Sequence, residues 1–355
     1  YSGKIESTGR LAAHFDYLSP DIQICCSDKP LYFVNNGTDN MNLISSTMKV
    51  HLEDNLIMDL EYSDSPDGSN AKTIKNVTAI DTAANTGNKY LKIQTYKPSY
   101  LFSTNYNSQL LKKIKNDGVT DLAEDAFTAV HFVDLADYDL TGVTYSDYSS
   151  KSDGSVKAWV NGTELYIGGY GKIIAGKSLS CALRDGKKID RITGLNLLDT
   201  SKTTDMGYMF LKCGTNSSVF TLDLGDCFDT SNVTNMVYMF GNCGQTSPVF
   251  ALNLGDKFDT SKVTDMSYMF IYCGYSSPTF KLDLGDKFDT SNVTTMYRMF
   301  ELCGYNSTAF TTLDLSTFNV SANTDLQRFA EDIPVSKFIF GKGWRNATLN
   351  MQYSK

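Results

Sequence analysis

Residues 221–250 read TLDLGDCFDTSNVTNMVYMFGNCGQTSPVF, and residues 251–280 read ALNLGDKFDTSKVTDMSYMFIYCGYSSPTF. These two blocks match at 19 of 30 positions, and residues 281–310 (KLDLGDKFDTSNVTTMYRMFELCGYNSTAF) match the second block at 19 of 30 without insertion or deletion. A degenerate copy precedes them at 195–214, and a shortened one follows at 313–329. Four to five units with atypical ends are the signature of a solenoid, a stack of structural repeats.

Each unit predicts a strand, a turn, a helix and a loop. Leu222 and Leu224 alternate with polar residues, as in a strand with one buried face. The Asp-Thr-Ser segment that begins at Asp229 offers N-cap oxygens, and the apolar residues between Val233 and Cys243 fall at helical spacing. A single unit cannot bury its own apolar face, so we expect a stacked spine made of Phe220, Phe250, Phe280 and Phe310.

The segments FDTSNVTNMVYMF, FDTSKVTDMSYMF and FDTSNVTTMYRMF resemble the repeats of BspA-like leucine-rich-repeat surface proteins. The resemblance covers about 192–340, and the preceding DGSVKAWVNGTELYIGGYGKIIAG looks like the leader of such repeats. Many repeats of that family are shorter, whereas GDKF or GDCF lengthens the turn after the strand here. The resemblance implies a secreted or cell-surface binding protein, often an adhesin, with no catalytic residues to carry over.

The amino-terminal half shows no such repeat. Short β-like segments occur at 31–34, 48–52, 56–62 and 90–96, and Asn161-Gly162 between two apolar runs is a hairpin signal. The expected fold class is α+β: a β-rich, sandwich-like domain over 1–150, a hairpin cap over 151–191, a leucine-rich-repeat-like α/β solenoid with 30-residue repeats over 192–340, and a C-terminal cap over 341–355. SGKIESTGRLAAHF and YFVNNGTDNMNLI also resemble the start of Gram-positive β-sandwich pilin or matrix-fibre subunits.

Composition and motifs exclude several functional classes. The net charge of −8 argues against nucleic acid as a partner, and no apolar run reaches the roughly 18 residues of a membrane-spanning helix. The chain has three His residues, no CxxC pair, no GxSxG motif and no phosphate loop, so the sequence shows no motif for an enzyme or a zinc site. We therefore expect no catalytic activity, no cofactor and no membrane insertion.

Tyrosines supply the best candidates for ligand contacts. Tyr208, Tyr238 and Tyr268 occupy one column that points away from the predicted apolar face, and Arg298 takes the fourth place. Tyrosine offers a large amphipathic contact area, but each ring could instead fold down against the next unit. The full candidate set is Tyr208, Tyr238, Tyr268, Tyr272, Tyr275, Tyr297, Arg298 and Tyr305. The sheet side, whose outward residues are small and polar, is the second choice.

Other repeated residues have simpler interpretations. Asp226, Asp256 and Asp286 are weak calcium candidates, because Asp is equally favoured in turns and helix caps. The cysteine column is expected to hold buried free thiols, on the argument that neighbouring helices lie about 10 Å apart. Its members are Cys213, Cys243, Cys273 and Cys303. Cys227 is expected at the surface, and the adjacent Cys25 and Cys26 could pair with each other, with Cys181, or not at all.

Nine N-x-S/T sequons could carry glycans in a eukaryotic secretory pathway. The principal acceptors would be Asn36, Asn76, Asn161, Asn216, Asn306 and Asn346, with Asn232, Asn292 and Asn319 inside the repeat motif.

The sequence as a whole predicts an extracellular or cell-surface, non-catalytic binding protein. Its partner would be a protein or glycan on a host or neighbouring cell, recognised through the solenoid. The alternative is a structural subunit of an extracellular filament or pilus, which would self-associate through its N-terminal β domain and carry the solenoid as a head. Assembly separates the two, because an adhesin can be monomeric whereas a filament subunit must join copies of itself.

Overall fold

A computed structural model describes residues 99–112, 126–321 and 324–344 with their side chains, and six strands of the earlier chain by backbone alone. The chain forms two compact units: the first is 1–99 with 170–172, and the second is 100–169 with 173–355. Residues 100–150, which we had expected in the N-terminal domain, therefore belong to the repeat-bearing unit.

The first unit contains two sheets of short strands. β2 (Leu31–Val34), β6 (Tyr90–Tyr96), β4 (Ile57–Ser63) and β5 (Lys72–Val77) form an antiparallel sheet in that order. β1 (Asp21–Ile24) pairs in parallel with β3 (Lys49–Leu52). The four segments expected to be β-like correspond to β2, β3, β4 and β6, while β1 and β5 were not expected.

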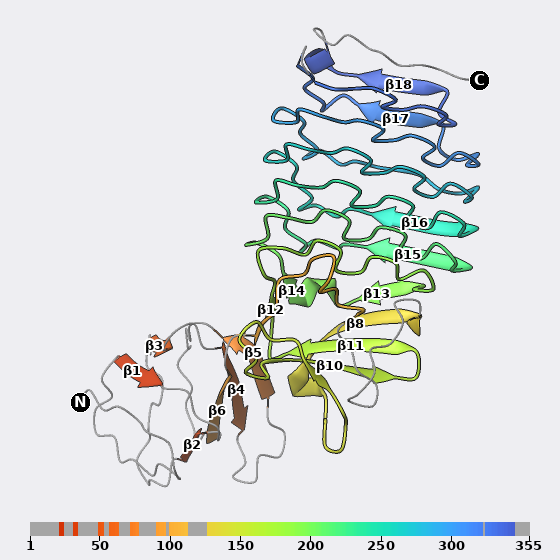
Figure 1. The fold of residues 1–355 in the computed structure, drawn as a ribbon. Coiled ribbons are helices and arrows are strands. Elements are labelled where there is room, and N and C mark those ends of the chain that lie inside the picture. The colour runs from red at the N-terminus through yellow and green to blue at the C-terminus, as the bar shows by residue number, and fades with distance from the viewer. Residues whose placement is uncertain are drawn as a thin grey trace. The chain divides into compact units, whose positions relative to one another are not determined.

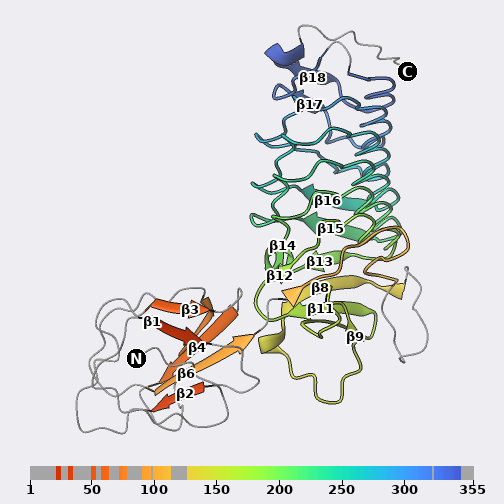
Figure 2. The same ribbon diagram turned by 60° about the vertical axis from the view of Figure 1, so that its left-hand side comes forward.

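The second unit is built around a seven-stranded sheet in the order β16-β15-β13-β8-β11-β10-β9 (Figures 1 and 2). The predicted hairpin is confirmed, because β10 and β11 are antiparallel and Asn161 pairs with Glu164 beside the turn. Two smaller sheets, β14-β12-β7 and β17-β18, complete the set. The remaining bounds are β7 Ser99–Tyr100, β8 Ala129–Asp134, β9 Ser146–Asp147, β10 Val156–Asn161, β11 Glu164–Gly169, β12 Ile173–Ile174, β13 Arg191–Thr193, β14 Leu198–Asp199, β15 Val219–Asp223, β16 Val249–Asn253, β17 Thr312–Leu315 and β18 Lys337–Phe340.

The repeats form a stack of coils, which Figure 1 shows from β13 to β18. Parallel bridges link equivalent residues 30 apart, from Asp205 to Asn235, Asp265, Thr295 and Asp325. The expected phenylalanine spine is confirmed: the rings of Phe220 and Phe250 stack with their centroids 5.3 Å apart. Neighbouring coils are therefore separated by about one strand spacing on this side.

The expected α+β class and α/β solenoid are wrong, because the described residues contain no α-helix. The helical elements that lie wholly within the described residues are 3₁₀ turns of three residues each: η3 (Leu135–Asp137), η4 (Leu195–Leu197) and η5 (Lys342–Trp344). The protein is β-rich, and the segment from Val233 to Cys243 is a series of tight turns.

Backbone geometry explains the failure of the helix prediction. Tyr238 and Asn242 adopt left-handed φ values of 55° and 54°, which a right-handed helix does not contain. The Met239 N–H donates to the Met236 carbonyl within the coil, whereas the Phe240 N–H donates to the Met269 carbonyl of the next coil. Part of the hydrogen bonding that would close a helix therefore joins one coil to the next.

The predicted core is nevertheless confirmed. Val233, Met236, Met239, Phe240 and Cys243 are fully buried. Two further phenylalanine columns stack beside the spine, one from Phe210 to Phe300 and one from Phe258 to Phe318. Apolar residues at helical spacing thus point inward from a turn coil as well as they would from a helix.

The thiols are free and buried as expected, but the reason given for this was wrong. Cys213, Cys243, Cys273 and Cys303 lie in coils whose rings stack at about 5.4 Å, not one helix diameter apart. Burial raises the pKa of Cys213, Cys243 and Cys273, which keeps these thiols protonated. Cys227 is exposed, as predicted, and Cys181 is a buried free thiol. Cys25 and Cys26 lie outside the described residues.

Candidate functional site

The tyrosine column sits at the left-handed positions of the turn coils. Tyr208, Tyr238 and Tyr268 have φ values of 61°, 55° and 61°, and Arg298 follows at 54°. A left-handed conformation costs an L-residue on the order of 1–2 kcal/mol, and glycine is the residue that adopts it freely. Three successive coils place a bulky aromatic residue there instead, so the ring must contribute something that offsets the backbone cost.

The rings stack on one another along the column. Tyr208 and Tyr238 have ring centroids 5.2 Å apart with an interplanar angle of 16°, and Tyr238 and Tyr268 are 4.3 Å apart at 9°. All three side chains are half-buried. The outcome lies between the two expectations, because the rings cover each other and still reach solvent.

The column continues into two neighbouring groups. Tyr297 meets Tyr268 edge to face at 5.2 Å, and the Arg298 guanidinium lies 5.2 Å from the Tyr297 ring centroid. Beside them, the rings of Tyr275 and Tyr305 stack at 5.1 Å. Ring contacts thus join the eight predicted contact residues in two groups, the column from Tyr208 to Arg298 and the three tyrosines around Tyr275, and we call the two groups together the tyrosine face. Its members are Tyr208, Tyr238, Tyr268, Tyr272, Tyr275, Tyr297, Arg298 and Tyr305.

Stacking changes the acidity of the central hydroxyl. Burial raises the pKa of Tyr238 to about 12, with smaller contributions from Tyr268 and Tyr208. Burial also raises the pKa of Tyr268. The Tyr238 and Tyr268 hydroxyls are therefore neutral at neutral pH, and they can donate and accept hydrogen bonds.

A group of ion pairs bounds the face at its C-terminal end. The carboxylate of Glu301, whose side chain is only 4% exposed, lies 3.2 Å from Arg298 Nε and 3.0 Å from Arg328 Nη2. Arg328 also pairs with Glu331. Burial raises the pKa of Glu301, while the two guanidinium groups oppose that shift. The tyrosine face thus ends in a desolvated, charge-balanced network.

This surface has the chemistry of a recognition site. Stacked aromatic rings supply apolar contact area with little rotamer freedom left to lose, and their hydroxyls supply polar contacts. Tyr and Arg are the residue types that dominate binding energy at interfaces.

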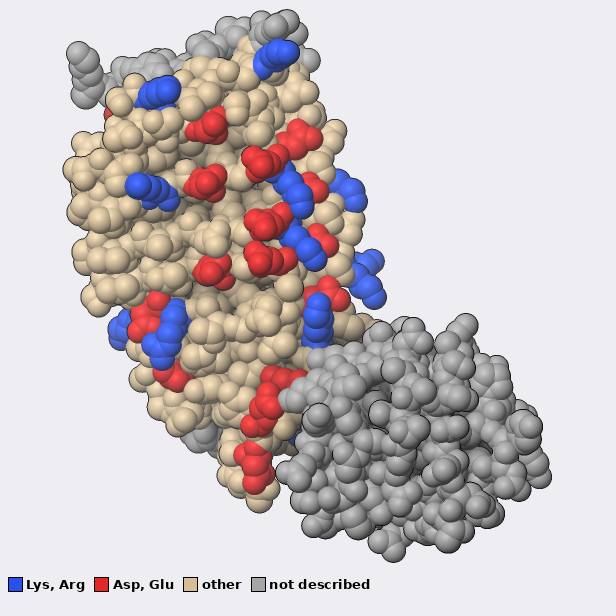
Figure 3. All heavy atoms as spheres, turned by 180° about the vertical axis from the view of Figure 1, so that it is seen from behind, with Lys and Arg blue, Asp and Glu red and all other residues tan. Residues whose placement is uncertain are grey.

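The aspartates that recur in each repeat act in turn formation. Asp229, Asp259 and Asp289 each accept a hydrogen bond from the backbone N–H two residues later, at 2.8–2.9 Å. The calcium candidates Asp226, Asp256 and Asp286 are exposed. Figure 3 shows carboxylates recurring in columns with basic side chains between them. Within the ranges described, no three acidic, His or Cys side chains are grouped closely enough to hold a metal ion.

Glycan acceptors are accessible where the structure describes them. Asn161, Asn216 and Asn306 are exposed, as are Asn232, Asn292 and Asn319 of the repeat motif. Nothing is described of the side chain of Asn76 in β5, and Asn36 and Asn346 lie outside the described residues.

A second aromatic cluster was missed by the sequence reasoning. His131, Tyr166 and Trp159 are cross-strand neighbours on β8, β11 and β10, with ring centroids 4.7 and 5.4 Å apart. Glu164 accepts a hydrogen bond from the Tyr166 hydroxyl at 2.9 Å and pairs with Arg191. The alternation in AVHFVD and ELYIGG signals that these side chains share a face, but pairing β8 with β11 requires the fold. His131 Nδ1 pairs with the Thr193 hydroxyl at 2.7 Å, whereas the buried Nε2 lies 3.3 Å from Glu164 Oε2 without a hydrogen bond. The cross-strand contacts favour a role in stabilising the sheet.

Comparison with known proteins found a match for the repeats alone. Residues 187–256 and 245–335 match the family described as "Mycoplasma protein of unknown function, DUF285". This match is consistent with the BspA-like repeats expected from the sequence; leucine-rich repeats and the pilin-like N-terminal resemblance gain no support from it. Neither a curated protein nor a solved structure matches this chain significantly. Within the described ranges, the structure holds no helix with the length and apolar character that a membrane span requires.

Proposed function

We propose that this chain is an extracellular or cell-surface, non-catalytic recognition protein that binds a protein or glycan through the tyrosine face. The observation that carries the proposal is the stack of Tyr208, Tyr238 and Tyr268 at strained left-handed positions. Left-handed φ values recur in each coil, also at Lys212 and Asn242, so the feature that distinguishes this column is its stacked and partly exposed rings.

The repeat architecture supports the same function. Stacked coils multiply a small contact into an extended surface, which is how repeat proteins bind large partners. The positions beside the column are small or apolar, including Gly207, Leu211, Gly241 and Ile271, so the rings have an apolar surround with the charged Arg298 at the end of the column. That surround lowers the desolvation cost of covering the face with a ligand.

The test is a screen of the intact protein against glycan and surface-protein arrays, followed by affinity measurements on the best binder. Tyr238→Ala is expected to weaken binding at least tenfold, the size of an interface hot spot. Tyr145→Ala is the matched control, because Tyr145 is 43% exposed and lies outside the tyrosine face. Circular dichroism and thermal melting establish that both variants are folded.

Three results would count against the proposal. Equal loss of affinity in the Tyr145 control would place the ligand elsewhere, and turnover of the bound ligand would make the protein an enzyme. Regular filaments of the purified protein in negative stain would favour the structural role. Accessibility of the chain to protease on intact source cells tests the proposed location.

A further inference from the structure

The last complete turn of the repeat stack is one residue shorter than those before it. Between the strand leucine and the next core phenylalanine, Leu284 and Phe288 enclose Gly285-Asp286-Lys287, whereas Leu315 and Phe318 enclose only Ser316-Thr317. Phe318 still stacks on Phe288 at 5.4 Å. The shorter turn cannot follow the path of its neighbour, so the Asp286 turn overhangs it.

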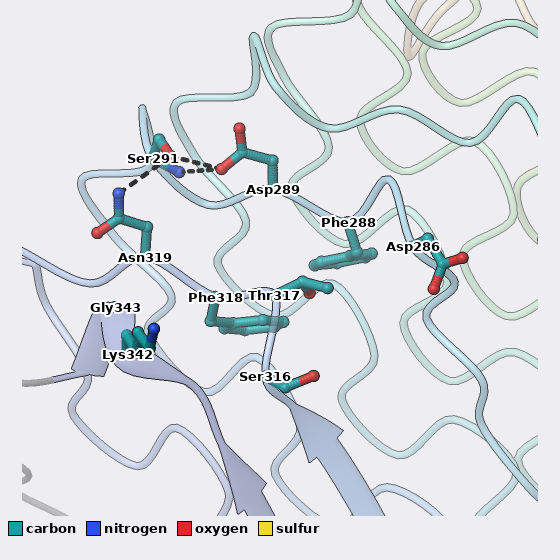
Figure 4. A pocket seen from close by; sticks show the side chains of 10 residues that line it. All are labelled: Asp286, Phe288, Asp289, Ser291, Ser316, Thr317, Phe318, Asn319, Lys342 and Gly343. Atoms are coloured by element: carbon teal, nitrogen blue, oxygen red, sulfur yellow. Dashed lines mark hydrogen bonds between the residues drawn. The ribbon is translucent and has the colours of Figure 1, made fainter.

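A hollow of about 780 Å³ lies between these two turns. Figure 4 shows the side chains that line it, with Asp286 and Lys342 on opposite sides of the stacked rings of Phe288 and Phe318. The hollow is shallow and largely open to solvent, so it suits a small ligand that keeps part of its surface in water. The lining residues are Asp286, Phe288, Asp289, Ser291, Ser316, Thr317, Phe318, Asn319, Lys342 and Gly343.

The C-terminal segment closes one side of the hollow. A Cβ on Gly343 would lie 2.2 Å from the Phe318 carbonyl oxygen, so only glycine lets η5 approach the last turn so closely. Trp344 then packs on Phe318 at 6.0 Å and donates a hydrogen bond to the Leu315 carbonyl at 3.0 Å. These contacts hold Lys342 at the rim.

The polar lining is partly ordered already. Asp289 Oδ1 accepts hydrogen bonds from the Ser291 backbone N–H at 2.8 Å and the Ser291 hydroxyl at 2.5 Å. Asn319 Nδ2 donates to Ser291 Oγ at 3.3 Å. The side chains of Asp289, Ser291 and Asn319 thus enter the hollow as a connected group, and Asp286, Ser316 and Thr317 at the rim are exposed.

We infer that this hollow binds a neutral saccharide unit, at a site separate from the tyrosine face. Carboxylate, amide and hydroxyl groups together both accept and donate hydrogen bonds, as the hydroxyls of a sugar require. Two carboxylates against one lysine disfavour an anionic ligand. An apolar ligand would leave the polar lining unsatisfied, because the Phe288 and Phe318 rings are almost completely buried.

The preceding coil supplies a matched control. Asp256 occupies the position of Asp286 one repeat earlier, in a turn that the next coil follows at full length. Saturation-transfer NMR of the intact protein with lactose, maltose and diacetylchitobiose is the primary measurement. At least one disaccharide is expected to bind, and Asp286→Asn together with Thr317→Tyr should reduce its signal at least fivefold. Asp256→Asn and Tyr145→Ala should leave the signal unchanged.

A second variant tests the origin of the hollow. Inserting one glycine between Ser316 and Thr317 restores the length of the earlier turns, so it should abolish binding without loss of the folded circular dichroism spectrum. The inference is overturned if no disaccharide binds. It is equally overturned if binding survives the Asp286→Asn, Thr317→Tyr variant, or if Tyr238→Ala removes it, since that result would assign the sugar to the tyrosine face.

Discussion

Replacing Gly255 by alanine tests whether the turns after the strands stack by direct backbone contact. Gly255 has a φ of +74°, and a Cβ there would lie 2.1 Å from the Gly225 carbonyl oxygen of the preceding coil. Gly285 occupies the same position one coil later at a φ of +71°, but a Cβ there would meet nothing within 4 Å. The two glycines share a conformation and differ in their surroundings.

The magnitudes follow from that difference. Alanine in the left-handed region costs about 1–2 kcal/mol, of which a stiffer unfolded chain returns roughly 0.4–1 kcal/mol. Gly285→Ala should therefore lower the free energy of unfolding by about 1 kcal/mol. Gly255→Ala carries the same cost plus forced displacement of a neighbouring backbone, and overpacking of this kind costs typically about 1–3 kcal/mol more.

Urea unfolding followed by circular dichroism and tryptophan fluorescence measures both variants. The only two tryptophans are Trp159 in β10 and Trp344 in η5, so fluorescence reports the two ends of the repeat-bearing unit together, whereas circular dichroism reports its strands as a whole. Different midpoints for the two signals would show that the stack unfolds in parts, and each transition is then fitted by itself. Equal destabilisation by Gly255→Ala and Gly285→Ala, within about 0.5 kcal/mol, would refute the backbone contact.

Three further outcomes are expected. Phe270 is fully buried, and its ring centroid lies 5.4 Å from those of Phe240 and Phe300. Phe270→Ala should therefore lower the free energy of unfolding by about 3–5 kcal/mol in the same assay. Val219→Ala, at a half-exposed site, should cost less than about 1 kcal/mol. The pKa of Tyr238 is raised to about 12 in the folded protein, against an ordinary value near 10, so the folded state keeps the hydroxyl proton to higher pH than the unfolded state does. The free energy of unfolding should therefore be constant below pH 10 and fall between pH 10 and 12. Tyr238→Phe should reduce that fall, as measured by urea midpoints across this range. A thiol reagent followed by peptide mass spectrometry should label Cys227 in the native protein within minutes and the buried Cys243 only on unfolding, and rapid native labelling of Cys243 would contradict its burial.

The core was readable from the sequence because a 30-residue repeat fixes which residues stack. Val233 and Met236 were assigned to the interior correctly, as were the phenylalanine spine and the short strand at Leu222. The backbone between them was not readable by periodicity, since turns with left-handed residues at Tyr238 and Asn242 place the same side chains inward as a helix would.

A signal against the helix was present in the sequence. A helix layer separates neighbouring coils by about 10 Å, whereas parallel strands separate them by about 4.8 Å. Phenylalanine columns recur on the strand side at Phe220 and on the turn side at Phe240, and both can stack only if the coils have equal spacing on both sides. The tyrosine face was foreseen as a column, but the contact between Tyr268 and Tyr297 depends on the turn geometry and was not predictable from spacing.

The change from tyrosine to arginine along the left-handed column is matched by a change in the column beside it. Where the column holds Tyr208 and Tyr268, the residue three positions later is Leu211 or Ile271; where it holds Arg298 and Arg328, that residue is Glu301 or Glu331. Each pair is internally consistent, because aromatic rings stack beside apolar groups and a buried carboxylate needs its guanidinium partners. Tyrosine combined with glutamate three positions later would place a ring beside a desolvated charge. Arginine combined with leucine or isoleucine there would leave the arginine unpaired. The change at Arg298 is therefore enforced by packing, and the stacked part of the column ends at Tyr268.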